Sequence, residues 1–481
     1  MNNVITRFAP SPTGYIHIGN VRSAIYPYLL ARQNQGKFIL RIEDTDRERY
    51  VEGATDLIED TLRWLRLDWD EGPEAGGENG PYFQSERLEI YHEWAKKLLK
   101  EKRAYVDPTP AEKIDEYRKE CTEKKIPFLY RNYRPEKLDF DFKPGVPIRF
   151  LSEPKEYNWT DAVMGEMSAG PETQDDIVLI KKDGYPTYNF AHIVDDALMQ
   201  VTHVMRGVEY LSSTPNYLAL YEAFGLERPV LVSLPHILAP TGNKKLGKRD
   251  GAKSATEYRD DGVLPEAMLN YLACLGWNDG TEQEIYTKDE LIARFSLERI
   301  QSSGARYDET KLLWMNGQWI RRIFDQDGAK ALQAKTAGFW PDEASNYSEE
   351  YQIKVLSIIY DRLKVMSDLK TMTDYFFKDP EIDMDMLKSN KFLKKLSEAE
   401  LEDLLKKSIA RLTDVSDWTV ENLNTALNGL LTETGQKPAV LFSLIRIAVS
   451  FAPFSPALDL TLNVLGKDVA LARLNAVARS I

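Results

Sequence analysis

The stretch VITRFAPSPTGYIHIGN at residues 4–20 decides the fold of the first part of the chain. Residues 4–9 are half apolar, as a buried strand requires, and the Pro and Gly residues between positions 10 and 14 interrupt that strand. From residue 20 to residue 33 the apolar side chains recur with helical spacing, and a short apolar run at 37–42 follows at once. Strand, turn, helix and strand in this spacing predict a βαβ unit with a parallel pair of strands.

The junction between this strand and this helix predicts an anion site. A helix that begins directly after a strand points backbone N–H groups and the positive end of its dipole at whatever lies above the junction, which suits a phosphate. His17 adds a hydrogen-bond donor, and Gly19 allows a flat ligand to lie against the backbone. For an isolated His-x-Gly, a capped turn with a hydrogen-bonded histidine would be the commoner interpretation.

A second cluster of cations lies at residues 244–249, which read KKLGKR. A lysine is a flexible point charge that can follow a developing pyrophosphate through a reaction. Alone, such a run is usually a solvated loop. Together with His17 at the other end of a nucleotide fold, it predicts two groups that hold a triphosphate between them. The chain contains no Gly-Lys-Ser/Thr loop, which argues against a P-loop kinase.

Composition narrows the class of protein. The chain has 481 residues, 43% of them hydrophobic and 28% charged, which predicts a soluble globular protein of several domains. Its net charge of -13 argues against a surface coated in nucleic acid. Two cysteines and five scattered histidines have no metal-ligand spacing, so we expect no structural zinc or other metal site. No signal peptide or membrane span is visible, and we expect a cytoplasmic monomer.

The two cationic motifs, His17-Ile18-Gly19-Asn20 and Lys245-Leu246-Gly247-Lys248-Arg249, resemble the two signature motifs of class I aminoacyl-tRNA synthetases. Other stretches resemble the glutamyl-tRNA synthetase family specifically: RFAPSPTG at 7–14, RIEDTD at 41–46, YPTYNF at 185–190, RG at 206–207 and KLLWMNG at 311–317. The resemblance continues weakly to 464–467, so it covers nearly the whole chain.

This resemblance implies a multidomain protein of α/β plus all-α class. It implies a Rossmann-type parallel-sheet catalytic domain in two halves, at residues 1–95 and 184–250, with the lysine loop in the second half. An inserted α+β module that binds the acceptor end of tRNA would occupy 96–183, a mixed stem-contact region 251–323, and a C-terminal helical anticodon-binding domain 324–481. The implied reaction is ATP-dependent ligation of L-glutamate to the 3′ end of tRNA(Glu) through a glutamyl-adenylate.

The resemblance also implies the site residues. Glutamate carries two carboxylates and one ammonium group, so its pocket needs two cations and one anion. Arg7 with Tyr188 would hold the side-chain carboxylate, Arg206 the α-carboxylate, and Glu43 with Ser11 the ammonium group. The family's ATP-binding residues correspond here to His17, Gly19, Asn20, Lys245, Lys248 and Arg249. His17 and Lys248 would be catalytic, and Mg²⁺ would accompany the phosphates of ATP.

Two departures from the family pattern keep alternatives open. Gly247 stands where serine is usual, and Asp250 where histidine is frequent, so a catalytically weakened tRNA-binding paralogue is one alternative. Glutamylation of tRNA(Gln), as well or instead, is another, since the sequence does not place the anticodon contacts. We assign no role to His192, because a histidine packed on an apolar strand is more often structural. We expect Trp314 and Trp319 to lie in the core.

Overall fold

The computed structural model describes residues 4–14, 16, 18–247, 253–452 and 455–481. The chain divides into two compact units. The first extends to Tyr258 and includes Pro265–Glu309, and the second comprises Arg259–Leu264 and Thr310–Ile481. Within the described ranges, no helix is long and apolar enough to cross a membrane.

The predicted βαβ unit is confirmed. Strand β1 (Ile5–Phe8) pairs in parallel with β2 (Lys37–Leu40), and helix α1 (Ile18–Gln33) connects them. Both strands are almost wholly buried, as their apolar sequences require. The helix begins two residues earlier than its periodicity predicts, so Gly19 and Asn20 lie in its first turn. The chain leaves β1 at the carboxyl end of the strand and continues toward α1.

A second parallel pair completes the catalytic sheet predicted for this unit. Strand β8 (His203–Gly207) pairs with β9 (Val230–Leu234), and helix α6 (Thr214–Phe224) connects them. The amide of Thr202, directly before β8, donates to the Ile5 carbonyl at 2.9 Å and so joins this pair to β1. Helix α5 (Tyr188–Leu198) precedes β8 and packs with α6 in the main core of the unit.

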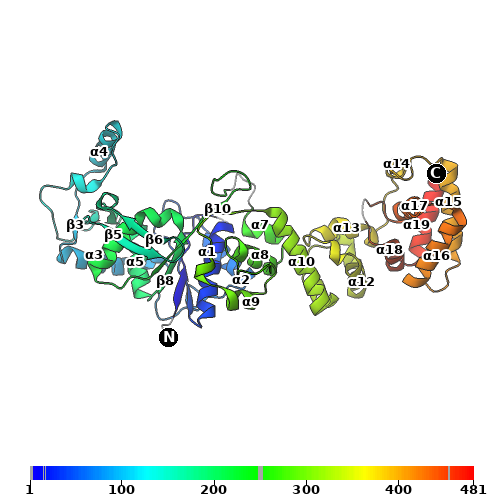
Figure 1. The fold of residues 1–481 in the computed structure, drawn as a ribbon, viewed down its shortest axis with the longest axis horizontal. Helices are drawn as coiled ribbons and strands as arrows, with labels where there is room; N and C mark the ends of the chain where they lie inside the picture. Colours follow the sequence, from blue (N-terminus) through cyan, green and yellow to red (C-terminus); the bar gives the residue numbers. More distant parts are fainter. Residues whose placement is uncertain (1–3, 15, 17, 248–252, 453–454) are drawn as a thin grey trace. The chain divides into compact units, whose positions relative to one another are not determined.

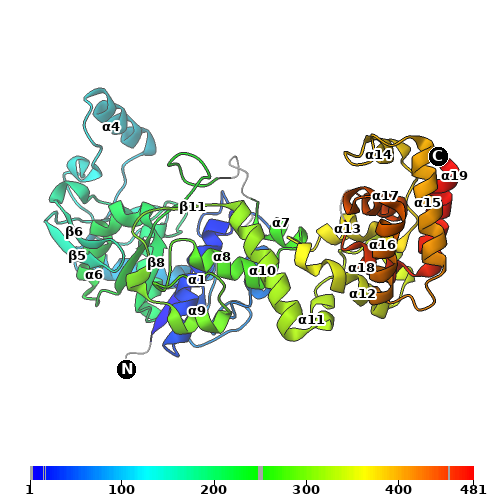
Figure 2. The ribbon, with the colours of Figure 1, turned by 45° about the vertical axis from the view of Figure 1, so that its right-hand side comes forward.

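Residues 96–183 contain both helices and strands. Helix α3 (Leu88–Lys100) leads into it, and strands β3 (Ala104–Val106), β4 (Ile148–Phe150) and β7 (Val178–Ile180) form an antiparallel sheet. Strands β5 (Tyr157–Asp161) and β6 (Gly165–Ala169) form a hairpin, and β5 extends the β8–β9 sheet by pairing Asp161 with Leu231. Helix α4 (Ala111–Glu123) projects from this region in Figures 1 and 2, and Cys121 is its buried residue.

Short helices and one small sheet close the first unit. They include α2 (Ala54–Trp64), α8 (Pro265–Cys274), α9 (Lys288–Arg294), and the parallel pair β10 (Ile237–Leu238) and β11 (Ala305–Arg306). Helix α7 (Ala255–Asp260) leads out of this unit. The buried Arg22 of α1 donates to the Leu275 carbonyl at 3.0 Å, which ties α1 to the segment after α8.

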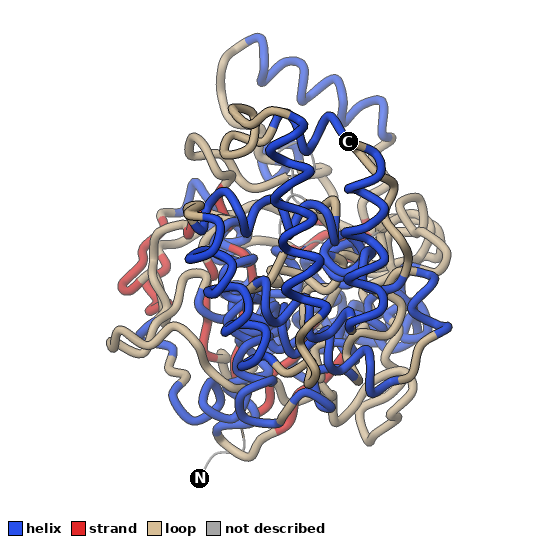
Figure 3. The backbone as a smooth tube through the Cα atoms, turned by 90° about the vertical axis from the view of Figure 1, so that its right-hand side faces the viewer, coloured by secondary structure: helices blue, strands red, loops and turns tan. Residues whose placement is uncertain are grey.

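The second unit is helical, as predicted, and its described residues from Thr310 onward contain no strand. Figure 3 shows its segments as blue helices joined by tan loops. The helices are α10 (Glu309–Asp327), α11 (Ala329–Gln333), α12 (Glu349–Ile359), α13 (Asp368–Phe377), α14 (Met384–Ser389), α15 (Glu398–Thr413), α16 (Val420–Thr434), α17 (Pro438–Ser450), α18 (Leu458–Leu465) and α19 (Lys467–Ser480). Leucine-rich faces of α15 to α19 share one core.

The two tryptophans of α10 differ, so one expectation is wrong. Trp319 is buried, whereas the side chain of Trp314 is 42% exposed. Residues five positions apart are rotated by about 140° around a helix, so the same core does not cover both.

Candidate active site

A cavity of about 360 Å³ opens where the parallel strands of the first unit end. Its lining includes the carboxyl-terminal residues of β1, β8 and β9, the loop after β1 and the first turn of α1. In open sheets with parallel strands, ligands bind outside the carboxyl ends of the strands. The cavity thus lies where the fold favours a ligand site.

Eight of the predicted site residues line this one cavity. They are Arg7, Ser11, Gly19, Asn20, Glu43, Tyr188, Arg206 and Lys245. The other three predicted residues, His17, Lys248 and Arg249, lie outside the described residues, and so does Asp250. Although the eight residues come from distant parts of the chain, they face one space.

Arg7 is held at the floor of the cavity by a buried carboxylate. Its Nε donates to Asp196 at 3.0 Å, its Nη2 to the same carboxylate at 3.4 Å, and its Nη1 to the Met205 carbonyl at 3.0 Å. The same Asp196 accepts from Arg41 Nη1 at 2.7 Å. Burial alone would raise the pKa of Asp196, but Arg7 and Arg41 bring this pKa well below its ordinary value. Asp196 is therefore an ionised group that fixes two guanidinium groups.

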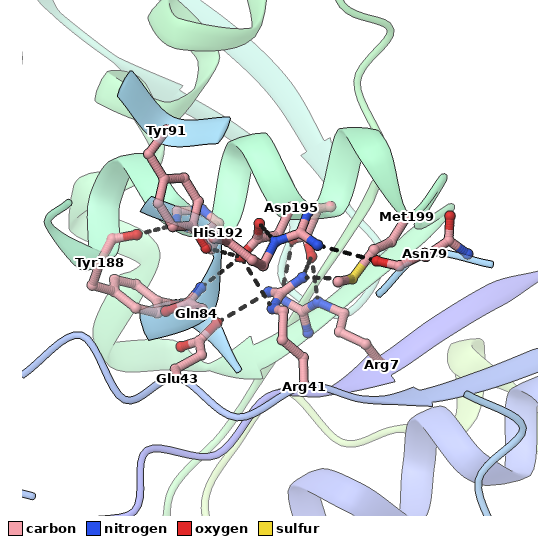
Figure 4. A network of polar contacts seen from close by, with 12 residues as sticks. Arg7, Arg41, Glu43, Asn79, Gln84, Tyr91, Tyr188, His192, Asp195 and Met199 are labelled. Carbon is pink, nitrogen blue, oxygen red and sulfur yellow. Dashed lines mark hydrogen bonds and ion pairs between the residues drawn. The ribbon is translucent and has the colours of Figure 1, made fainter. Parts of the chain in front are cut away.

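Arg41 links this carboxylate to the opposite wall of the cavity. Its Nη2 donates to Glu43 Oε1 at 3.0 Å, and its Nε lies 3.6 Å from Asp195. The other partners of Asp195 are Arg87 Nε at 2.8 Å, Gln84 Nε2 at 2.7 Å and the Tyr91 hydroxyl at 2.8 Å. Figure 4 shows these side chains converging on one buried network.

The network carries one positive charge in excess. The site contains four buried arginines (Arg7, Arg41, Arg87 and Arg206) and three buried carboxylates (Glu43, Asp195 and Asp196), which form ion pairs with the first three arginines. Arg206 has no carboxylate within 4 Å among the residues that the structure describes. Its guanidinium lies instead 4.3 Å above the Tyr217 ring and 3.3 Å from His192 Nε2. A buried charge without a counter-ion is unfavourable, so this site favours a ligand with a net negative charge.

Helix α5 supplies one wall of the site, and the sequence reasoning missed most of that wall. Tyr188, His192, Asp195 and Asp196 follow one another at spacings of four, three and one, which places them on one face of the helix. His192 lies on this helix and not, as the sequence had led us to expect, on a strand, and it is buried behind Tyr188 and Arg206. The available signal was four polar side chains at helical spacing.

The opposite end of the cavity suits an anion. Gly19 and Asn20 lie in the first turn of α1, where backbone N–H groups point outward. The Lys245 Nζ lies 2.9 Å from the Glu209 carboxylate on the facing wall. Burial would raise the pKa of Glu209, but hydrogen bonds from a backbone N–H and from Lys245 bring this pKa below its ordinary value. Lys245 thus lies beside an ionised carboxylate, and both residues line the cavity.

The described part of the chain contains no group of three or more His, Cys, Asp or Glu side chains that could hold a metal ion. The two cysteines are separate free thiols.

Comparisons with known proteins agree with this geometry. Residues 3–314 match the family model of the catalytic domain of class I tRNA synthetases (E and Q), and residues 329–478 match an anticodon binding domain. The glutamate–tRNA ligase of Dehalococcoides mccartyi is 40% identical over 486 residues, which cover 99% of this chain and 98% of the relative. That of Clostridium kluyveri is 38% identical over 488 residues, 98% of this chain and 97% of the relative.

Solved structures give the same result. The crystal structure of a glutamate tRNA ligase from Elizabethkingia meningosepticum, in complex with its amino acid, superimposes with a TM-score of 0.88 at 32% identity. The alignment covers 100% of both chains. The glutamate-tRNA synthetase from Elizabethkingia anophelis superimposes with a TM-score of 0.85 at 31% identity and covers 99% of this chain and 100% of that chain.

Proposed function

This chain belongs to the class I tRNA synthetases for glutamate and glutamine, and we propose that it joins L-glutamate to the 3′ end of tRNA in an ATP-dependent reaction. The observation that carries the choice of amino acid is the excess positive charge of the buried network. Glutamate has a net charge of minus one and balances that excess. Glutamine is neutral and would leave it uncompensated, at a cost in binding.

Each polar group of glutamate has a partner in the cavity. Asp196 occupies the Nε side of the Arg7 guanidinium. The side-chain carboxylate of glutamate can therefore bind at the Nη1 and Nη2 end, next to Tyr188. Arg206 would receive the α-carboxylate. Glu43, with Ser11, would hold the ammonium group.

Glu43 lies where its carboxylate can bind the ammonium group of the ligand. Arg41 holds its Oε1, which leaves Oε2 directed away from that contact. Burial raises the pKa of Glu43, against the attraction of Arg41 and Arg7. An ammonium group from the substrate would form a direct ion pair with Glu43 and so offset the energetic cost of burying its charge.

The reaction would proceed in two steps without a covalent enzyme intermediate. An oxygen of the α-carboxylate attacks the α-phosphorus of ATP, and pyrophosphate leaves as glutamyl-adenylate forms. The terminal ribose hydroxyl of tRNA then attacks the acyl carbon, and AMP leaves. Catalysis rests on positioning and on stabilising the developing charge of the phosphates, for which we propose His17 and Lys248. Gly19, Asn20, Lys245 and Arg249 would complete the ATP site.

Mg²⁺ would bind with the phosphates of ATP. The carboxylates that line the cavity, Glu43 and Glu209, are engaged by Arg41 and Lys245. A magnesium ion held mainly by the nucleotide's phosphates and by water fits this donor set, since Mg²⁺ commonly binds proteins through substrate phosphates. When bound, it would neutralise phosphate charge during the first step.

We further propose how the domains contact tRNA. Residues 96–183 would bind the acceptor end, 251–323 the stem, and 324–481 the anticodon, in a cytoplasmic monomer. In the helical unit, Arg446 is half-buried, its Nε makes no hydrogen bond, and burial followed by the nearby charge of Arg362 lowers its pKa. Two neighbouring guanidinium groups favour a phosphate of the nucleic acid backbone.

Charging assays test the proposed function. Purified protein is given ATP, labelled glutamate, and either tRNA(Glu) or tRNA(Gln), and tRNA-dependent exchange of labelled pyrophosphate is measured in parallel. We expect both charging and exchange with tRNA(Glu). Absence of both activities in folded protein would favour a tRNA-binding paralogue, and charging of tRNA(Gln) would extend the substrate range.

A further inference from the structure

His192 makes four contacts that together determine how its ring lies. Its Nδ1 is 2.8 Å from the Tyr188 carbonyl, one turn earlier in α5, and its Nε2 is 3.3 Å from Nη1 of Arg206. One face stacks on the Tyr188 ring at 4.8 Å, and the Tyr217 ring meets it edge-on at 4.7 Å. The ring is buried and lies within the site shown in Figure 4.

The partners of the two ring nitrogens determine the tautomer. A backbone carbonyl can only accept a hydrogen bond, so Nδ1 must carry the proton. A guanidinium can only donate, so Nε2 must present its lone pair to Arg206. Burial, followed by the charge of Arg206, lowers the pKa of His192 to about 3, so the ring is neutral at physiological pH. His192 is therefore an uncharged acceptor for a buried guanidinium.

Arg7 and Arg206 differ in the charge of the group that holds each guanidinium. Arg7 is held by a carboxylate, Asp196, which also serves Arg41. Arg206 is held by a neutral ring nitrogen and by the face of Tyr217, neither of which cancels its charge. A carboxylate in place of His192 would orient Arg206 equally well but would remove the excess charge of the network.

We propose that His192 is a positioning residue for amino-acid binding, which holds Arg206 in place while leaving its full charge for the α-carboxylate of the substrate. This inference rests on the proposed function, because it takes the role of Arg206 from it.

Three ligands separate the two carboxylate contacts. L-Glutamate has both carboxylates, isoglutamine has an amide in place of the α-carboxylate, and glutamine has an amide in place of the side-chain carboxylate. The ratio of glutamate to isoglutamine affinity thus reports on Arg206, and the ratio of glutamate to glutamine affinity on Arg7. Both ratios are measured as inhibition constants, or as KM for glutamate, in the charging assay.

The principal variant is His192→Phe, which keeps an aromatic ring between Tyr188 and Tyr217 but removes the acceptor. We expect the preference for glutamate over isoglutamine to fall about tenfold, as for the loss of a hydrogen bond to a charged group. The preference for glutamate over glutamine and the KM for ATP should change less than about twofold. His192→Gln, which can still accept, should recover most of the loss.

His92→Phe is the matched control, since it makes the same substitution at a histidine outside the site. His92 Nε2 lies 2.8 Å from the Gly184 carbonyl, and His92 is absent from the cavity lining. An equal loss in this control, an equal loss for all ligands in His192→Phe, or no loss at all would overturn the proposal. Imidazole ¹⁵N NMR of the wild-type protein gives a second measurement that needs no variant, since a proton on Nε2 of His192 near neutral pH would also overturn it.

Arg206→Gln separates this inference from the function on which it rests. If this variant keeps the preference for glutamate over isoglutamine, the proposed role of Arg206 is wrong and the role of His192 falls with it. If Arg206→Gln loses the preference while His192→Phe keeps it, only the role of His192 is wrong.

Discussion

Replacing Arg7 with glutamine tests the origin of amino-acid selectivity. In the variant, a bound glutamate would keep a buried side-chain carboxylate without its cation, which costs about 3 to 5 kcal/mol. A bound glutamine would lose a hydrogen bond from the charged guanidinium to its neutral amide, worth roughly 1.5 kcal/mol. The difference of about 1.5 to 3.5 kcal/mol predicts that the preference for glutamate over glutamine falls by about 10- to 350-fold.

The structure limits the side effects of this change. Asp196 loses its contacts with Arg7 at 3.0 and 3.4 Å but keeps Arg41 at 2.7 Å, so no buried carboxylate is left without a cation. We therefore expect the variant to fold, with a modest decrease in melting temperature. The assay is tRNA charging, with kcat/KM for glutamate and the inhibition constant of glutamine measured on the same preparation.

Arg87→Gln is the control for the charge of the network. Arg87 belongs to the same cluster through Asp195 at 2.8 Å and is absent from the cavity lining. Asp195 would keep Gln84 and Tyr91 as donors. We expect this variant to lose stability and, because it removes the excess positive charge without a contact to the ligand, to lower the preference for glutamate, but by less than Arg7→Gln does. Equal losses for both amino acids in Arg7→Gln would remove Arg7 from the side-chain pocket, and an unchanged preference in Arg87→Gln would refute a selectivity set by the charge of the whole network.

Three further predictions concern the reaction itself. His17→Ala or Lys248→Ala should lower tRNA-dependent pyrophosphate exchange about 10²-fold with folding intact, since each removes a preorganised donor to developing charge; near-normal turnover would contradict the phosphate clamp. Gly247→Ser should raise kcat without changing the KM for glutamate if the missing hydroxyl is a lost transition-state contact, whereas an equal gain in Gly247→Ala would indicate a stiffer loop instead. Burial raises the pKa of Glu43, so the wild-type KM for glutamate should rise as the pH falls through that raised pKa. Glu43→Gln should have a high KM at every pH, and its pH profile should lack this step.

The fold was predictable because its signals are local. The strand, the Pro/Gly turn and the helix of residues 4–33 are encoded in successive residues, and a parallel pair follows from their order. The helical second unit was predictable for the same reason. Trp314 shows the limit of this reasoning, since periodicity identifies the helix but does not show which of its faces a core covers.

The site was predictable only in part. Arg7, Glu43 and Arg206 follow from the charges of the ligand that the family resemblance implies, and all three line the cavity. The residues that hold these side chains in place could not be predicted in this way, because Asp196 is 155 residues from Arg41 and 189 from Arg7 along the chain. No spacing rule connects residues so far apart, and only the fold shows that α5 presents its polar face to both.

The two arginines of the amino-acid site are held in different ways, and this difference has a consequence for selectivity. Every carboxylate of the buried network has at least one arginine partner, whereas Arg206, of the four arginines counted above, has no carboxylate partner among the described residues. The charge that the substrate must supply is therefore set by the network as a whole, while the position of each substrate carboxylate is set by a single guanidinium. A neutral amino acid of the same shape can satisfy the positions and still leave the charge unbalanced. Rejection of glutamine consequently requires no steric barrier in the pocket, because the uncompensated buried cation already disfavours it.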